Sequence, residues 1–149
     1  MYSLKKTTEK LLGELLIERK VISKKDCDKA LDIQRERGGL IGEILVELGL
    51  VKEENIAQAV TAQYGFPYLP LANYEIGPEI VKIIPENVCA QYCLIPIDKI
   101  GGNLTIAMSN PLNQEAVEDI EELTKCTVQI FVATTTDIRN AIAKYYKNK

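Results

Sequence analysis

Few residues in this chain could carry out catalysis. The 149 residues include no histidine, so the commonest general base is missing. No glycine is followed by a lysine, and the phosphate-binding loop G-x-x-x-x-G-K-[ST] is therefore absent. The remaining candidates are carboxylates, and Glu118, Asp119, Glu121 and Glu122 crowd together as the solvated face of an acidic helix would. We therefore expect no catalytic site in this chain.

The four cysteines, Cys27, Cys89, Cys93 and Cys126, do not form a metal-binding pattern. They include no C-x-x-C pair, and there is no histidine to complete a zinc site. Cys89 and Cys93 lie four residues apart, which is the spacing of neighbours on one helical face. We expect small buried residues here, and no bound metal.

Side chains that could bind a ligand recur in two copies of one 24-residue unit, 11–34 and 40–63. A glutamine near the end of each copy offers both a donor and an acceptor, although it could equally bond to the backbone. A period near 30 residues is the size of one supersecondary unit, which buries its apolar face against a neighbour. We infer a paired module with pseudo-symmetric surfaces. The identities at an offset of 29 residues are Gly13 with Gly42, Glu14 with Glu43, Leu16 with Leu45, Glu18 with Glu47, Ala30 with Ala59 and Gln34 with Gln63.

The spacing of apolar residues predicts that each copy is a pair of helices. In the first copy, Ser23 can cap the second helix with Asp26 three residues later, and Gly38 can end it. In the second copy, Gly49 marks the turn and Gly65 the end. Residues 7–65 are therefore expected to form four helices in two similar pairs.

The pattern changes after residue 66. Pro78 and Pro85 suit the first turns of two short helices, and β-rich runs flank a turn at 101–103, which predicts a hairpin. A helix is expected at 113–125, a strand at 127–132 and a final helix at 136–146. The fold class is therefore α+β, with an N-terminal helical lobe of two repeated helix pairs (1–66) and a small, mostly antiparallel or mixed sheet covered by helices (67–149).

Composition and charge exclude some classes of protein. No apolar run approaches the ~20 residues of a membrane span, and no signal peptide is evident, so we expect a soluble cytoplasmic chain. The net charge of −3 combines +3 over residues 1–39 with −6 over the rest. The basic end could attract an acidic partner, a phosphate or an anionic lipid, or be an ordinary solvated face. A helix-turn-helix DNA reader fits the outline, but the candidate reading helix 53–64 carries Glu53 and Glu54 and no base, which disfavours DNA.

Three phrases carry a resemblance to a known family. They read LGELLIERKVISKKDCDKALDIQ, IGEILVELGLVKEENIAQAVTAQYGFPYLPL and LIPIDKIGGNLTIAMSNPLN. They resemble the N-terminal (MshE N-type) domain of the ATPases that power type II secretion and type IV pilus assembly. The doubled unit with its five-residue spacer, 35–39, is the specific feature, and the resemblance spans nearly the whole chain.

This resemblance implies a non-catalytic docking or regulatory domain. Such a domain binds the cytoplasmic part of an inner-membrane platform protein and serves an ATPase motor domain in cis or in trans, at the periphery of the inner membrane. In one branch of the family the two repeats also bind cyclic di-GMP, which is the alternative function. The residues matched to that nucleotide site are Leu12, Gly13, Leu16, Leu31 and Gln34 in the first copy and Ile41, Gly42, Leu45, Val60 and Gln63 in the second. No other cofactor is implied.

This chain departs from the nucleotide-binding branch at three positions. Leu11 and Leu40 stand where that branch has arginine, and Lys20 replaces the glycine that the second copy keeps as Gly49. Lys10, Arg35 or Arg37 could supply a cation from adjacent positions, although a lysine lacks the planar fork that pairs with guanine. Nucleotide binding therefore ranks behind docking.

Overall fold

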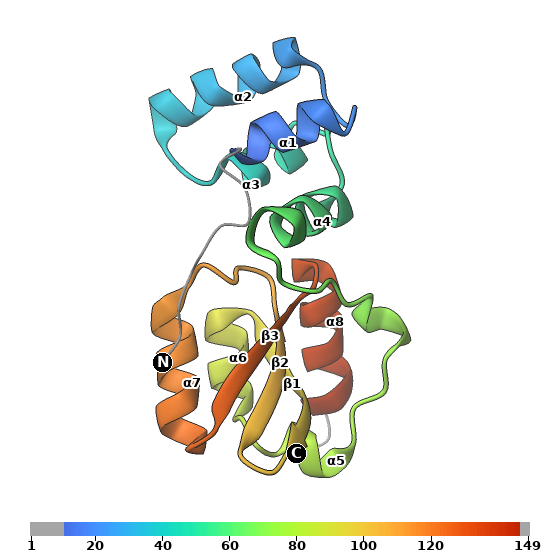
Figure 1. The fold of residues 1–149 in the computed structure, drawn as a ribbon, viewed down its shortest axis with the longest axis vertical. Helices are drawn as coiled ribbons and strands as arrows, with labels where there is room; N and C mark the ends of the chain where they lie inside the picture. The colour runs from blue at the N-terminus through green and yellow to red at the C-terminus, as the bar shows by residue number, and fades with distance from the viewer. Residues whose placement is uncertain (1–10, 147–149) are drawn as a thin grey trace. The chain divides into compact units, whose positions relative to one another are not determined.

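The computed structural model describes residues 11–146, and these divide into two compact units (Figure 1). The boundary lies between Gly65 and Phe66. The first unit is the repeat lobe, 11–65, and the second is the sheet lobe, 66–146. Each lobe has a hydrophobic core of its own.

The repeat lobe consists of helices that confirm the expected two pairs. Its four helices are α1 (Leu12–Glu18), α2 (Lys24–Arg37), α3 (Ile41–Glu47) and α4 (Glu53–Tyr64). The first and second helices of the two copies begin 29 residues apart, as the sequence repeat requires. Ser23 caps α2, since its hydroxyl accepts a hydrogen bond from the Asp26 backbone N–H at 3.1 Å. Gly65, in the left-handed conformation, ends α4.

The two copies interlock instead of folding separately. α1 packs chiefly against α4, and α2 against α3, so each close helix pair combines one helix from each copy. This exchange buries the apolar stripes of both copies in one core. The buried members of that core are Leu16, Ile22, Cys27, Ala30, Ile44, Leu45, Val51 and Ala59.

The turn inside each copy is the same backbone structure. Lys20 and Gly49 occupy equivalent positions with φ angles of 62° and 74°. The next residue in each copy donates its N–H back to the first helix, from Val21 to Leu16 at 3.0 Å and from Leu50 to Leu45 at 3.1 Å. This is the bonding of a Schellman motif, in which the left-handed residue is normally glycine. The fold therefore holds Lys20 in a conformation that Gly49 adopts without strain.

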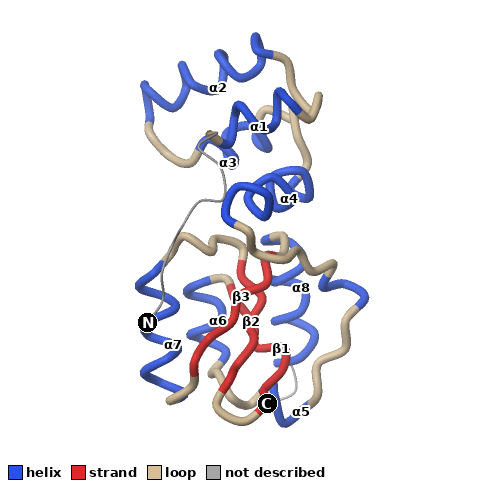
Figure 2. The backbone as a smooth tube through the Cα atoms, viewed as in Figure 1, coloured by secondary structure: helices blue, strands red, loops and turns tan. Residues whose placement is uncertain are grey.

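The sheet lobe contains a mixed sheet of three strands, β1 (Leu94–Ile100), β2 (Asn103–Met108) and β3 (Thr127–Val132), in the order β1-β2-β3 (Figure 2). β1 and β2 are antiparallel around a turn at Gly101, which confirms the expected hairpin. β2 and β3 are parallel, and helix α7 (Gln114–Thr124) connects them. The other helical segments are η1 (Leu71–Asn73), α5 (Pro78–Val81), α6 (Glu86–Tyr92) and α8 (Thr135–Tyr146).

Helices pack against the sheet and complete the core of this lobe. α5, α6 and α8 contact β1, α8 also contacts β2, and α7 contacts β3. Cys89 is buried in this core, as expected. Cys93 differs from the expectation of a helical neighbour, because it ends α6 in the left-handed conformation with φ 52° and is partly exposed. The largest fully buried side chains are Ile84, Leu94, Ile95, Leu104, Ile106, Met108, Val117, Ile120 and Ile138.

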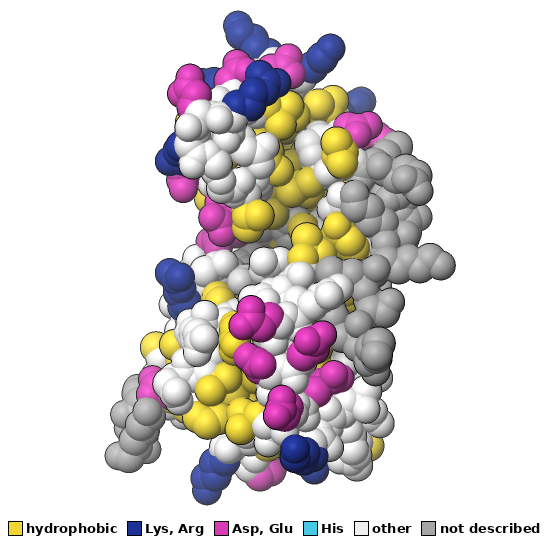
Figure 3. Space-filling view, turned by 90° about the vertical axis from the view of Figure 1, so that its left-hand side faces the viewer, with side chains coloured by type: hydrophobic (Ala, Val, Ile, Leu, Met, Phe, Trp, Pro, Cys, Tyr) yellow, Lys and Arg dark blue, Asp and Glu magenta, His cyan; other side chains and the backbone are white. Residues whose placement is uncertain are grey.

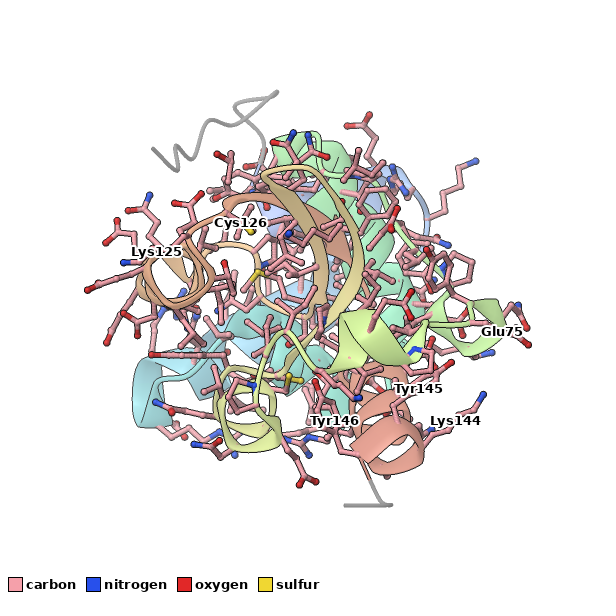
Figure 4. All side chains as sticks on the ribbon, turned by 90° about the horizontal axis from the view of Figure 1, so that it is seen from below. Glu75, Lys125, Cys126, Lys144, Tyr145 and Tyr146 are labelled. Carbon is pink, nitrogen blue, oxygen red and sulfur yellow. The ribbon has the colours of Figure 1, made fainter. Side chains whose placement is uncertain are left out.

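The C-terminal helix is fastened to this core by Tyr146 (Figure 4). Its buried hydroxyl lies 2.8 Å from the carbonyl oxygens of Val81 and Ile84 and 3.4 Å from Cys89 Sγ. Burial raises the pKa values of both the Tyr146 phenol and the Cys89 thiol, the latter to about 11. The cluster satisfies two carbonyl groups at the end of α5 and before α6, which would be costly to leave unpaired.

We predict that the free energy of unfolding falls between about pH 9 and 11. The Cys89 thiol ionises near 9.0 when unfolded but near 11 in the folded chain. Because folding raises this pKa, the stabilisation is fully present below pH 9 and is lost as the pH rises through 11. The difference corresponds to roughly 3 kcal/mol. Urea unfolding followed by far-UV circular dichroism across this range measures it, and Cys89→Ala should reduce the alkaline loss. An unchanged loss in that variant would contradict the assignment.

Candidate functional site

The ten residues matched to the nucleotide site all lie in the repeat lobe, but they differ in burial. Leu16 and Leu45 are completely buried, with no exposed surface. Gly42 and Gln63 are buried as well. The partly exposed members are Leu12, Gly13, Leu31, Gln34, Ile41 and Val60. Only the latter group presents side chains or backbone to a ligand without a rearrangement of the lobe.

The two glycines of the set are explained by helix packing. A Cβ atom at Gly13 would lie 2.8 Å from Cys27 Sγ, and one at Gly42 would lie 3.0 Å from Ile56 Cγ2. Cys27 and Ile56 are themselves equivalent in the repeat, so the same close approach occurs twice. Side-chain packing is too dense to accept an extra methyl group at such contacts without displacement. Both glycines are therefore required by the fold whether or not a ligand binds.

The two glutamines lie in different surroundings despite their equivalence. Gln34 donates a hydrogen bond from Nε2 to the carbonyl oxygen of Gly39 at 3.0 Å, and so joins the end of α2 to the spacer between the copies. This is the backbone-bonding role that the sequence left open for these glutamines. Gln63 is only 6% exposed within α4. A ligand that used both amides would have to reorganise the Gln34 contact and reach into the lobe at Gln63.

The positions where the nucleotide-binding branch has arginine carry exposed leucines. Leu11 is 60% and Leu40 54% exposed, and each stands immediately before the first helix of its copy. Neither side chain has a hydrogen-bond donor, so neither can pair with a base or a phosphate. Their exposure also means that a longer side chain could be placed at either position without clashing with the core.

The neighbouring arginines form ion pairs at the surface. Arg35 pairs with Asp32 at 2.8 Å, and Arg37 pairs with Glu47. Both pairs are largely exposed, so each contributes at most about 1 kcal/mol. Either guanidinium could therefore exchange its carboxylate for an anionic ligand at little cost. Lys10, the other candidate cation, lies outside the described residues.

The structure offers no alternative chemistry in the repeat lobe beyond these contacts. Within residues 11–146, no cluster of three or more potential metal ligands occurs. Over the same span, no helix has both the length and the apolar character required to cross a membrane. What the lobe presents is an apolar, pseudo-symmetric surface with one accessible amide and exchangeable arginines.

We predict opposite effects on stability from two substitutions at the equivalent turns. Lys20→Gly should raise the free energy of unfolding by about 0.5–1 kcal/mol, because glycine adopts a positive φ without steric cost. Gly49→Lys should lower it by about 1 kcal/mol for the same reason. No atom lies within 4 Å of a Cβ placed at Gly49, so packing does not confuse the comparison. Urea unfolding of both variants gives the values; changes of the same sign would show that the turns are not equivalent.

Comparison with known proteins relates this architecture to secretion and pilus machinery. The MshEN domain family matches residues 64–149. The chain is 35% identical over 138 residues to the type IV pilus assembly ATPase PilB of Myxococcus xanthus, a match that covers 93% of this chain and 24% of that protein. It is 23% identical to the type II secretion system protein E of Xanthomonas campestris over 95% of this chain and 26% of that protein. The chain thus spans about a quarter of the length of these relatives.

A solved structure of similar fold covers both lobes. It is described as MshE with cdg, that is, cyclic di-GMP, and has a TM-score of 0.80 and 25% sequence identity. The alignment covers 93% of this chain and all of the other. The similarity therefore extends beyond residues 64–149 and includes the repeats.

Proposed function

The chain belongs to the MshEN domain family, which is found in the N-terminal region of type IV pilus and type II secretion ATPases, and from this we propose that it is a docking and regulatory domain of such an ATPase. Its partner would be the cytoplasmic part of a protein of the inner-membrane platform. The observation that carries the proposal is that both lobes match together, over 93% of this chain but only 24% of the pilus ATPase. The two lobes thus behave as one module, separate from the rest of the motor.

The proposed role includes no nucleotide hydrolysis by these residues. The chain lacks the Gly-Lys dipeptide of a phosphate-binding loop, so the remainder of the ATPase would supply the motor, in cis or in trans. We expect purified protein to release no phosphate from ATP or GTP above the buffer blank. Phosphate release that is abolished by a substitution within these residues would contradict this prediction.

The proposed place of action is the cytoplasmic face of the inner membrane. Two separately cored lobes can present different surfaces, one to the platform and one to the motor. In the repeat lobe, the exposed Leu11 and Leu40 form part of an apolar surface of the kind that protein partners cover.

The experiment that tests docking is a binding survey of the platform. The full chain is immobilised, and the cytoplasmic segments of all platform proteins from the source organism are passed over it separately. We expect at least one segment to be retained, and resin without the chain serves as the control. Retention of none of them would contradict the docking function.

A second candidate function, binding of cyclic di-GMP, is favoured by the similarity to MshE with this nucleotide. The packing that frames such a site is present, because Gly13 and Gly42 permit the same close helix contact in both copies. The donors are missing at Leu11 and Leu40. A charge-assisted hydrogen bond contributes about 1.5–3 kcal/mol, so the loss of two lowers affinity by roughly a hundredfold to ten-thousandfold. We therefore propose docking as the function and a nucleotide site reduced to weak or no binding.

A further inference from the structure

A groove lies between helices α6 and α7 of the sheet lobe, away from the repeats in the sequence. Its volume is about 570 Å³, and side chains of both helices line it. Figure 3, which views the side where α7 lies, shows acidic and hydrophobic side chains next to one another on this lobe. The lining residues are Val88, Gln91, Tyr92, Asp119, Glu122, Leu123 and Lys125.

The acidic charge of α7 is not explained by the stability of the helix. The helix carries five acidic residues and no basic one, and several are three or four positions apart, where like charges repel. Glu121 and Glu122 lie in its last turn, where the helix dipole disfavours negative charge. Only Glu121 has a clear structural task, because its carboxylate accepts a hydrogen bond from the Val128 N–H at 3.0 Å. Within residues 66–146 the acidic residues outnumber the basic ones by ten to five.

The remaining carboxylates of α7 are available to a cationic partner. Glu115, Glu118, Asp119 and Glu122 are exposed, and none of them takes part in an ion pair within the described part of the chain. Asp119 accepts a hydrogen bond from the Tyr92 hydroxyl, which ties α6 to α7 across the groove. That bond, together with burial and the charges of Asp119 and Glu115, raises the pKa of Tyr92 to about 12. The local potential at the groove is therefore negative.

The groove also has an apolar part. Leu123 is 52% exposed, although the other apolar residues of α7, Val117 and Ile120, are fully buried. Val88 and the Tyr92 ring, on the opposite helix, are half-buried. An apolar floor beside an acidic rim matches one kind of ligand, in which cationic and apolar groups are carried on the same backbone.

We propose that the α6–α7 groove docks a cationic amphipathic segment of a protein partner. α7 has 11 residues and is therefore about 16 Å long, which accommodates about three turns of a partner helix with lysine or arginine on one side and leucine-like residues on the other. The groove is formed by the sheet lobe alone. The proposal therefore goes beyond platform docking and nucleotide binding, and neither function has to hold for it to be correct.

The test uses a synthetic, helix-forming leucine–lysine peptide as the probe, and the same peptide with glutamate for lysine as its control. The full chain, labelled with ¹⁵N, is titrated with each peptide at low and at physiological salt. We expect saturable one-to-one binding of the lysine peptide, weaker at higher salt, with amide shifts concentrated in α6 and α7. Absence of saturable binding, equal binding of the glutamate peptide, or shifts concentrated elsewhere would overturn the proposal.

Matched variants separate the groove from general acidity. Glu118→Gln with Glu122→Gln should weaken binding about tenfold or more, whereas Glu75→Gln with Glu79→Gln removes the same charge elsewhere on the lobe and should change it less than about twofold. Leu123→Ser should weaken binding about fivefold or more, because it removes part of the apolar floor. Equal losses in both charge variants, or no effect of Leu123→Ser, would contradict the groove. Self-association of the chain that the groove variants abolish would assign the groove to a second copy instead and also overturn the proposal.

Discussion

Simultaneous Leu11→Arg, Leu40→Arg and Lys20→Gly substitutions are expected to raise the affinity for cyclic di-GMP by about tenfold or more. Leu11 and Leu40 occupy equivalent exposed positions before α1 and α3, so arginine side chains can be accommodated there. Lys20 adopts the same left-handed conformation as Gly49, so the glycine restores the turn without altering the fold. The gain arises because arginine offers the planar set of donors that pairs with guanine or phosphate.

Calorimetric titration of the natural sequence and this variant at one salt concentration measures the difference. Leu112→Arg with Leu123→Arg is the matched control, because both leucines are exposed but lie in the sheet lobe. This control should show no gain, although it adds the same charge. Low-micromolar binding by the natural sequence would show that Arg35, Arg37 or Lys10 supplies the missing contacts. No gain in the substituted repeat lobe would mean that the repeats are only a packing or docking surface.

The second large effect is expected on stability. Leu16→Ala and Leu45→Ala should each lower the free energy of unfolding of the repeat lobe by about 2–5 kcal/mol. Both side chains are completely buried in the core that the two copies share, so each substitution leaves a cavity. The family resemblance assigns these leucines to a nucleotide site, but their burial assigns them to the interlocked packing of the helices.

The measurement combines far-UV circular dichroism, which follows all helices, with the near-UV tyrosine signal. Among the described residues of the repeat lobe Tyr64 is the only tyrosine, whereas the sheet lobe has five. The far-UV transition should shift while most of the tyrosine signal persists. Leu11→Ala, the same change at an exposed position, should alter stability by no more than about 0.5 kcal/mol. A loss below about 1 kcal/mol in Leu16→Ala and Leu45→Ala would contradict the packing assignment.

Local structure could be predicted from the sequence where one residue decides it. The repeat predicted two helix pairs because turn residues such as Gly49 and caps such as Ser23 determine where helices end and begin. The hairpin turn at Gly101 followed for the same reason. The resemblance to secretion and pilus ATPases was carried by the phrases around these residues and is confirmed by the family match.

Tertiary partners could not be predicted in the same way. Apolar periodicity shows which face of a helix is buried but not which helix covers it, so the exchange of α1 and α2 between the copies was not foreseen. The parallel pairing of β3 with β2 likewise depends on the path of α7 across the lobe. Equivalence in sequence also concealed the different surroundings of Gln34 and Gln63. The groove was missed because acids on α7 were attributed to a solvated face; the absence of any base among them was the available signal.

The docking function can be tested most directly by the distribution of the motor in the cell. The full chain is overproduced in the source organism, and the fraction of the pilus or secretion ATPase that sediments with the inner membrane is measured. A docking domain without a motor should compete for the platform, so this fraction should fall as the chain accumulates. The Leu45→Ala variant, with its weakened repeat lobe, should compete less. An unchanged membrane fraction at a large excess of folded chain would contradict the proposed docking function.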